Sequence, residues 1–191
     1  MPAASVPASS VTAEFSWPIP CLPLRDGELE LVPWGEVASI SNVREDLVES
    51  CNDPRMVRWT QVPHPYTEAH AAAFLEMPAN ELRWALVVDE RYCGNVALRL
   101  VSEQHRAAEF GYNAAQWMRG RGMMTRAVHL VTEHAFAHSF HRLVIRANVD
   151  NAASRHVAEA CGYTLEGVLR GAELLHGEFV DLAQYARLTA D

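Results

Sequence analysis

Arg119-Gly120-Arg121-Gly122-Met123-Met124 is the most informative stretch of the chain, because it joins an expected strand to an expected helix. Residues 107–113 are expected to form the strand. The helix is expected over about residues 122–138, where apolar side chains recur at helical intervals along one face: Met124, Ala127, Val128, Val131 and Ala135. The stretch therefore predicts a tight strand–loop–helix junction.

A glycine-rich turn at the start of a helix is suited to bind an anion, because it leaves successive backbone N–H groups without partners. The helix dipole adds to this preference, and glycine lets the backbone approach a ligand closely. Arg119 and Arg121 add positive charge and planar hydrogen-bond donors. We expect a pyrophosphate at this loop, with a mere turn as the alternative. The loop is neither a Walker A motif nor a dinucleotide fingerprint, since Gly-Lys-Ser/Thr and a third glycine are missing.

The segments on either side of this junction predict a mixed sheet. Hairpins at both ends, with a strand–helix–strand unit between them, indicate an α+β domain on a mixed, mainly antiparallel sheet flanked by helices. Strands are expected at residues 28–33, 83–89, 92–101, 143–148, 164–169 and 179–188, and helices at about 34–50, 68–77 and 151–160.

The first 23 residues differ from the rest of the chain. They contain half of its ten prolines among alanine, serine and valine, and this composition cannot bury a periodic face. We expect residues 1–23 to form a flexible tail or an arm on the surface, and residues 24–191 to form one domain.

Composition and charge exclude several classes of function. The net charge of −8 argues against a general nucleic-acid binder, which needs a basic face to neutralise phosphates. No run of about 18 apolar residues is present, so no membrane-spanning helix is expected, and the N-terminus lacks the pattern of a secretory signal. Four scattered cysteines without a Cys-x-x-Cys pair favour a reducing cytoplasm. His134 and His138 are four residues apart, but no third ligand is evident, so we expect no metal.

Arg119-x-x-Gly122-x-Met124 resembles the coenzyme A signature of the GNAT superfamily, Arg/Gln-x-x-Gly-x-Gly/Ala. The resemblance runs in order from about residue 24 to the end of the chain. Met124 stands where the signature has a small residue, and its side chain either crowds the pyrophosphate or points into the core. The surrounding sequence is similar to the RimJ/RimL branch, the ribosomal-protein N-acetyltransferases, in Glu109–Tyr112, Asn151–Ser154 and Cys161–Gly167.

This resemblance implies a GNAT fold with splayed central strands and acetyl-CoA as the co-substrate. It places the pantetheine arm in the gap between those strands, where the backbone of Tyr112, Asn113 and Ala114 would pair with it. Asn151 would contact the same region, or would simply cap its helix. The pyrophosphate would be cradled by the loop and the first helical turn, which contain Arg119, Gly120, Arg121, Gly122, Met123, Met124 and Thr125.

The resemblance also implies the groups that carry the chemistry. Glu173 matches the RimL glutamate proposed as the base, and Ser154 matches the serine proposed as the acid near the coenzyme sulfur. A backbone N–H within residues 111–113 would stabilise the oxyanion. Ser154 could instead simply cap its helix, and Glu173 could be a solvated charge in a loop between strands. In that case Glu109 or Glu166 would be the alternative base.

The expected activity is acetyl transfer from acetyl-CoA to a primary amine within a ternary complex. A protein N-terminal α-amine is the easier acceptor, because its pKa is about 7.7–8.0 whereas that of lysine is about 10.4. The family has its substrate-side loop where this chain has Trp59–Tyr66. The alternatives are a small-molecule amine, such as an antibiotic or an amino sugar, and a catalytically silent domain that binds acyl-CoA. RimL-like relatives also imply a homodimer.

Overall fold

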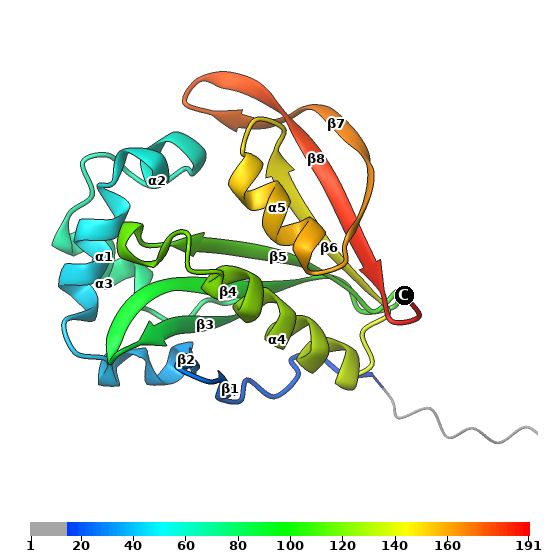
Figure 1. Ribbon diagram of the computed structural model, residues 1–191, viewed down its shortest axis with the longest axis horizontal. Coiled ribbons are helices and arrows are strands. Elements are labelled where there is room, and N and C mark those ends of the chain that lie inside the picture. Colours follow the sequence, from blue (N-terminus) through cyan, green and yellow to red (C-terminus); the bar gives the residue numbers. More distant parts are fainter. Residues whose placement is uncertain (1–14) are drawn as a thin grey trace, which may run out of the picture.

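Eight strands form one twisted sheet at the centre of the fold (Figure 1). The structure, a computed structural model, describes residues 15–191. Within this sheet β5 and β6 are parallel and the other neighbours are antiparallel, so the expected α+β class with a mixed, mainly antiparallel sheet is confirmed. The order is β1 (Leu24–Asp26), β2 (Leu29–Pro33), β3 (Glu81–Val88), β4 (Arg91–Ser102), β5 (Ala107–Ala114), β6 (Arg142–Asn148), β8 (Glu178–Leu188) and β7 (Thr164–Leu175).

Three of the helices begin at a residue whose side-chain oxygen caps them. The side chains of Asp53, Thr67 and Asn151 cap α2, α3 and α5. The helix expected over about 34–50 is divided, because Asn42 has a left-handed backbone (φ 54°) that separates η1 from α1. No helix within the described residues is long and apolar enough to cross a membrane. The helical segments are η1 (Trp34–Ser39), α1 (Val43–Cys51), α2 (Pro54–Trp59), α3 (Glu68–Phe74), η2 (Gln116–Met118), α4 (Met123–Ala137) and α5 (Ala152–Ala160).

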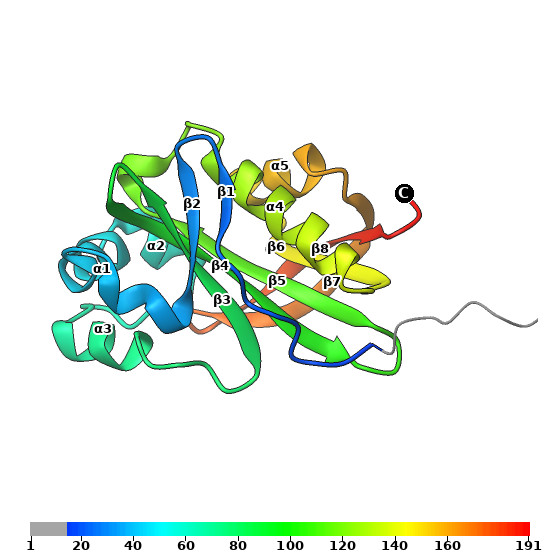
Figure 2. The ribbon, with the colours of Figure 1, turned by 90° about the horizontal axis from the view of Figure 1, so that it is seen from below.

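Apolar side chains pack on both faces of β3, which explains why this strand ends in a continuous apolar run from Trp84 to Val88. Trp84, Leu86 and Val88 belong to the core cluster that α4 and α5 cover, whereas Ala85 and Val87 pack with η1, α1 and α3. Figure 2 shows α1 and α3 well separated from α4 and α5. The predicted apolar face of α4 is buried in full and holds this helix against the sheet: Met124, Ala127, Val128, Val131 and Ala135.

Residues 15–23 pack against the domain as an arm, which is the second of the two expected arrangements for this segment. Ile19 is buried within the cluster that α4 covers. The ring of His134 on α4 lies with Nε2 2.7 Å from the backbone oxygen of Pro20, which holds the arm to the helix. Residues 1–14, the rest of the expected tail, lie outside the described part of the chain.

The parallel strands β5 and β6 separate after a short pairing. Ala107–Phe110 are in register with Arg142–Ile145, and beyond this point β5 continues to Ala114 and β6 to Asn148. β6 stays paired with β8, and the β7–β8 hairpin bends away from the rest of the sheet (Figure 1). The expected splay of the central strands is therefore present.

Candidate active site

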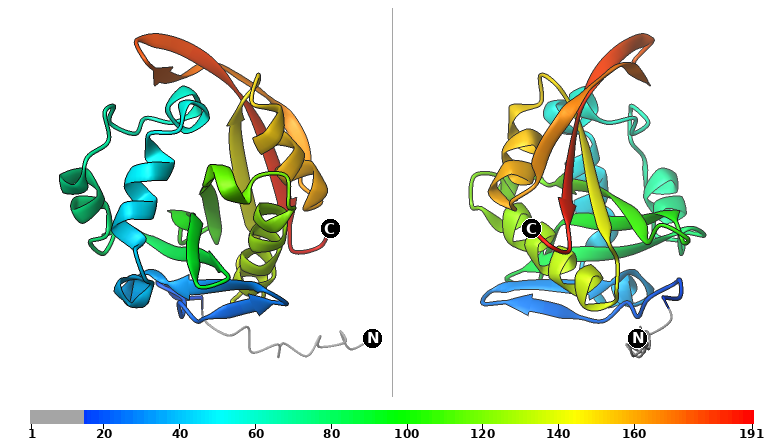
Figure 3. Two further views of the ribbon diagram at one scale, coloured as in Figure 1. Left: turned by 60° about the vertical axis from the view of Figure 1, so that its left-hand side comes forward. Right: turned by 90° about the vertical axis from the view of Figure 1, so that its right-hand side faces the viewer.

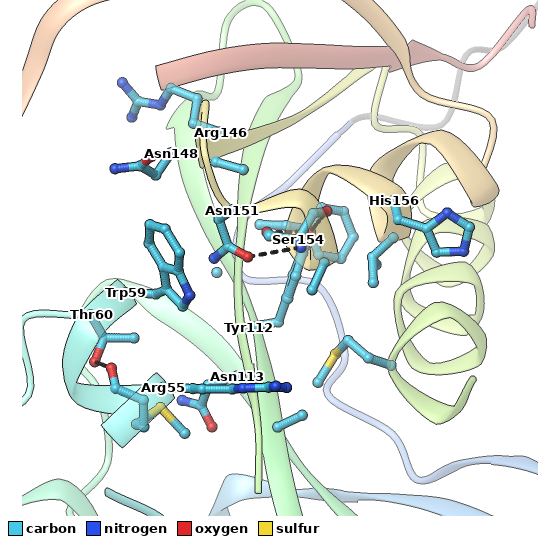
Figure 4. Close-up of a pocket in the computed structure, with 18 of the residues that line it drawn as sticks. Arg55, Trp59, Thr60, Tyr112, Asn113, Arg146, Asn148, Asn151, Ser154 and His156 are labelled. Atoms are coloured by element: carbon cyan, nitrogen blue, oxygen red, sulfur yellow. Dashed lines mark hydrogen bonds between the residues drawn. The ribbon is translucent and has the colours of Figure 1, made fainter. Parts of the chain in front are cut away.

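A cleft of about 1190 Å³ opens where β5 and β6 separate. Its lining comes from β5, the loop before α4, the first turns of α4 and α5, the helix α2 and the strand β7. In Figure 4, Trp59 of α2 and Asn151 before α5 approach the cavity from opposite walls, with Tyr112 of β5 below them. Of the residues that the resemblance assigned to the cofactor and to the chemistry, all except Arg121 and the alternative base Glu166 line this cleft.

The loop before α4 leaves its backbone accessible. Gly120 and Gly122 have positive φ angles of 75° and 72°, and among the described residues no atom lies within 4 Å of where a Cβ would stand at either position. Gly122 is the N-cap of α4 and has no side chain with which to cap the first N–H groups of the helix. Met123 and Met124 point into the core and are buried. Met124 therefore packs into the core as the helical pattern indicates, and it also lines the cleft.

The two arginines of this loop have different surroundings. Arg119 lines the cleft, and its Nη2 lies 2.6 Å from Oδ1 of Asp53, the residue that caps α2. Partial burial raises the pKa of Asp53, but the hydrogen bond from Arg119 and those from the backbone outweigh it and lower the pKa. Arg121 is turned away from the cleft and faces Glu28 at 3.6 Å. The sequence alone did not separate the two.

Ser154 and Tyr112 form a hydrogen-bonded pair in the cleft. Ser154 Oγ donates to the Tyr112 hydroxyl at 3.1 Å, and that hydroxyl donates to the Ser154 carbonyl at 3.0 Å. Burial raises the pKa of Tyr112, so the phenol stays protonated. Asn151 Oδ1 accepts from the Ser154 backbone N–H at 3.2 Å, which is the capping bond that the sequence predicted. The phenol of Tyr112 is a functional group that sequence analysis missed, because only its backbone was assigned a role.

The candidate acids differ in the partners they hold. Glu109 receives hydrogen bonds from Arg146, whose Nε lies 2.9 Å from Oε1. Glu166 is outside the cleft, and the hydrogen bond from Arg142 lowers its pKa. Glu173 lies in the cleft and accepts a bond from the neutral amide of Gln61, at 2.9 Å.

Glu173 is in strand β7, opposite Val180, and not in a loop between strands as expected. The pairing of β7 with β8 is irregular between Leu169 and Glu173, and Gly171 has a positive φ of 57°. This irregularity made the segment resemble a loop in sequence. It also turns the half-buried Glu173 side chain towards the cleft.

A further wall of the cleft is formed by α2 and by Ala172 and Glu173 of β7, and the tip of the β7–β8 hairpin contacts α2. Figure 3 shows the hairpin arching over towards α2. His176 Nε2 at the tip lies 2.7 Å from the backbone oxygen of Val57. Trp59 lines this wall, and Arg58 stacks on its ring at 4.4 Å. Arg55, Arg58 and Gln61 also line the cleft, although no sequence motif pointed to them.

Sequence comparison identifies the family of the chain. Residues 40–164 match the acetyltransferase (GNAT) domain. The ribosomal-protein-serine acetyltransferase of Escherichia coli (strain K12) is 31% identical over 101 residues, which are 52% of this chain and 56% of that protein. The YdaF protein of Bacillus subtilis (strain 168) is 33% identical over 110 residues, 57% of this chain and 60% of that protein. The chain thus spans little more than half the length of these curated relatives.

Solved structures share the fold. The microcin C7 self-immunity acetyltransferase MccE, in complex with acetyl-CoA and AMP, superposes with a TM-score of 0.75 at 24% identity and covers 85% of this chain and 93% of its own. RimL, the ribosomal L7/L12 α-N-protein acetyltransferase, in complex with coenzyme A, superposes with a TM-score of 0.73 at 22% identity. The match covers 87% of this chain and 97% of the RimL chain. With this fold, a matching domain over most of its length and a cleft between splayed strands, the chain belongs to the GNAT acetyltransferase family.

Proposed function

We propose that this protein transfers the acetyl group of acetyl-CoA to a primary amine, and that the amine is the N-terminal α-amine of a protein. The observation that carries the proposal is the continuity of one cleft, which extends from the exposed N-terminus of α4 to the carboxylate of Glu173. One end of this cleft suits a diphosphate, and the other offers a base to an amine.

The residues present fit coenzyme A. The first N–H groups of α4 and the guanidinium of Arg119 would hold the pyrophosphate, because open space surrounds Gly120 and Gly122. The pantetheine arm would lie along Tyr112, Asn113 and Ala114, where β5 has lost β6 as a partner. Acetyl-CoA supplies the activated thioester, and the chain supplies position and proton transfer.

Glu173 would accept the proton that the attacking amine loses. Of the acids in the cleft, Glu109 is bound by Arg146 and Glu81 by Arg83 and Arg99, so arginine N–H groups already occupy the carboxylate oxygens that a base would offer to an amine. Glu173 is bonded to the neutral side chain of Gln61, which an arriving ammonium could replace.

Ser154 would donate a proton to the departing thiolate. Its hydroxyl is held by Tyr112, and a small rotation about χ1 would transfer the hydrogen bond from the phenol to the sulfur. A backbone N–H of residues 111–113 would stabilise the oxyanion, since the β6-facing side of this segment has no strand partner in the described sheet.

An α-amine suits this site better than a lysine side chain. Deprotonating lysine requires about 2.5 pKa units more, which corresponds to about 3.4 kcal/mol. A single carboxylate with a neutral partner matches the lower requirement. The RimL and ribosomal-protein-serine acetyltransferases, to which this chain is similar, carry protein substrates in their names.

The test is a thiol-release assay with acetyl-CoA and a panel of acceptors: peptides with free N-termini, the same peptides with blocked N-termini and a free lysine, aminoglycosides and polyamines. We expect turnover with the free N-termini, and loss of about 10²-fold or more in kcat for Glu173→Gln. Glu166→Gln is the matched control, because Glu166 lies outside the cleft. Turnover confined to a small molecule would overturn the choice of acceptor. Uptake of coenzyme A without turnover of any amine would instead indicate a silent acyl-CoA-binding domain.

A further inference from the structure

Helix α2 is held in place by polar contacts at both ends. Of its six residues Met56 is buried and the others are exposed or half-buried, so the core fixes it weakly. A helix this short is not stable by itself. Its position therefore depends on the groups that bind its ends, and two of these groups, Arg119 and Glu173, line the cleft.

At its N-terminal end α2 contacts Arg119, in the loop before α4. Asp53 Oδ1 accepts from the backbone N–H groups of Arg55 and Met56, at 3.0 and 3.1 Å, and is also 2.6 Å from Nη2 of Arg119. The same carboxylate thus caps the helix and orients the arginine. Arg119 has five N–H donors, and those not directed at Asp53 are free to face a phosphate.

Beyond its C-terminal end α2 is tied to the candidate base. Gln61, two residues after the helix, donates to Glu173 at 2.9 Å, and His176 of the same hairpin contacts the Val57 carbonyl at 2.7 Å. Since Trp59 also lies on this segment, α2 connects the phosphate-binding loop with the acceptor wall and with Glu173.

We propose that Asp53 is a positioning residue that couples the two halves of the cleft: a diphosphate on Arg119 fixes the Asp53–Arg119 pair, which orders α2 and with it the acceptor wall. This inference rests on the proposed function, because it requires coenzyme A at the loop. Coupling between sites is reciprocal, so an acceptor that orders α2 also tightens the binding of coenzyme A.

Hydrogen exchange with coenzyme A alone as the probe tests the coupling without an acceptor. In the wild type, saturating coenzyme A should slow exchange of the amides of residues 55–60 by about fivefold or more. Asp53→Asn keeps an oxygen for the helix cap but removes the charge that holds Arg119. The Kd of this variant for coenzyme A, measured by calorimetry, should lie within threefold of the wild-type value. Saturating coenzyme A should nevertheless slow exchange of its α2 amides less than twofold. Arg119→Gln at saturating coenzyme A should lose the slowing as well.

Asp26→Asn is the matched control, because Asp26 pairs with Arg126 on α4 at 2.6 Å and does not touch α2. In this control, saturating coenzyme A should slow exchange of the α2 amides as much as in the wild type. Retention of the slowing in Asp53→Asn, or in Arg119→Gln if the first variant does not fold, refutes the coupling. Binding of coenzyme A to the wild type with no change in α2 refutes the coupling and leaves the proposed function standing. No binding of coenzyme A refutes both.

Discussion

Replacing Gly94 with alanine should damage both stability and coenzyme A binding, because this glycine brings β4 against the cleft-lining end of β5. Gly94 lies opposite Ala114 and has a φ of 135°. A Cβ there would stand 2.2 Å from the backbone oxygen of Asn113, where real contacts begin at about 3.0 Å. The strand carrying Asn113 would have to move by about 0.8 Å, the difference between these two distances.

Two costs set the expected loss of stability. A left-handed backbone costs an L-residue about 1–2 kcal/mol, and an overpacked contact between backbones costs about 1–3 kcal/mol. Together they predict about 2–5 kcal/mol, or a fall of about 4–20 °C in the unfolding temperature for a domain of this size. Because Asn113 and Ala114 would pair with pantetheine, the displacement should also weaken coenzyme A by about tenfold, the value of one lost hydrogen bond.

Thermal unfolding gives the first quantity, and calorimetry with coenzyme A, well below the unfolding temperature, gives the second. Gly35→Ala is the control, because its Cβ would meet only Met77 Sδ at 3.9 Å, an ordinary contact, and its φ is not positive. An unfolding temperature for Gly94→Ala within 2 °C of the control, with coenzyme A affinity within twofold of the wild type, would refute the reasoning.

Four further substitutions test roles that the structure assigns to different groups. Ser154→Ala should lower kcat about 10²-fold, and Tyr112→Phe should lower it about fivefold. If the phenol acts through the serine, the double variant should be no slower than Ser154→Ala. A double variant in which the two losses multiply would contradict this role. Met124→Ala should destabilise the fold by about 2–5 kcal/mol yet leave the Kd for coenzyme A within threefold, because the side chain is buried in the core; a large gain in affinity would mean that it crowds the pyrophosphate after all. Burial lowers the pKa of His134 below 6.5. The contribution of this histidine to stability is therefore complete above the pKa of the unfolded chain and is lost as the pH falls. Between about pH 7.5 and pH 5.5 the unfolding temperature should fall more for the wild type than for His134→Gln, and an equal fall in both proteins would contradict this.

Local patterns were sufficient to predict most of the elements. The face of α4 follows directly from the spacing of Met124, Val128 and Val131, because burial of one helical face repeats every three or four residues. The cap at Asn151 follows from an asparagine before a helical run. In both cases the residues that determine the feature lie within a few positions of it. The helical spacing and the capping residue each indicate one local structure.

Features that depend on distant contacts could not be predicted in this way. The arm at residues 15–23 packs because His134 and the core cluster receive it, and neither partner is visible in the proline-rich sequence of the arm itself. Glu173 was assigned to a loop because Gly171 and the irregular pairing interrupt the strand pattern. The strand exists because β8 supplies its partners.

The choice among the acids needed the structure for the same reason. The resemblance assigned the base to Glu173 and left Glu109 and Glu166 as alternatives, since nothing local in the sequence reveals which arginine faces which carboxylate. The pairing of β5 with β6 brings Arg146 to Glu109. Arg142, on the same strand, is bound to Glu166. The hydrogen-bond partner of Glu173 is instead the neutral side chain of Gln61, a distinction made by the fold and by no motif.

The two halves of the cleft differ in how firmly they are built, and this difference bears on what determines the acceptor. The cofactor half is made of backbone, at the end of β5 and the start of α4, and both elements are anchored by the core. The acceptor half is closed by single polar contacts such as Gln61 to Glu173 and His176 to the Val57 carbonyl. Each such contact is worth about 1 kcal/mol, so one or two substitutions in α2 or the hairpin tip can reshape this wall while the cofactor half stays intact. Acceptor choice should therefore change with Trp59 and Gln61 and be insensitive to residues 119–124, which is why the coenzyme A signature predicts a cofactor and no acceptor.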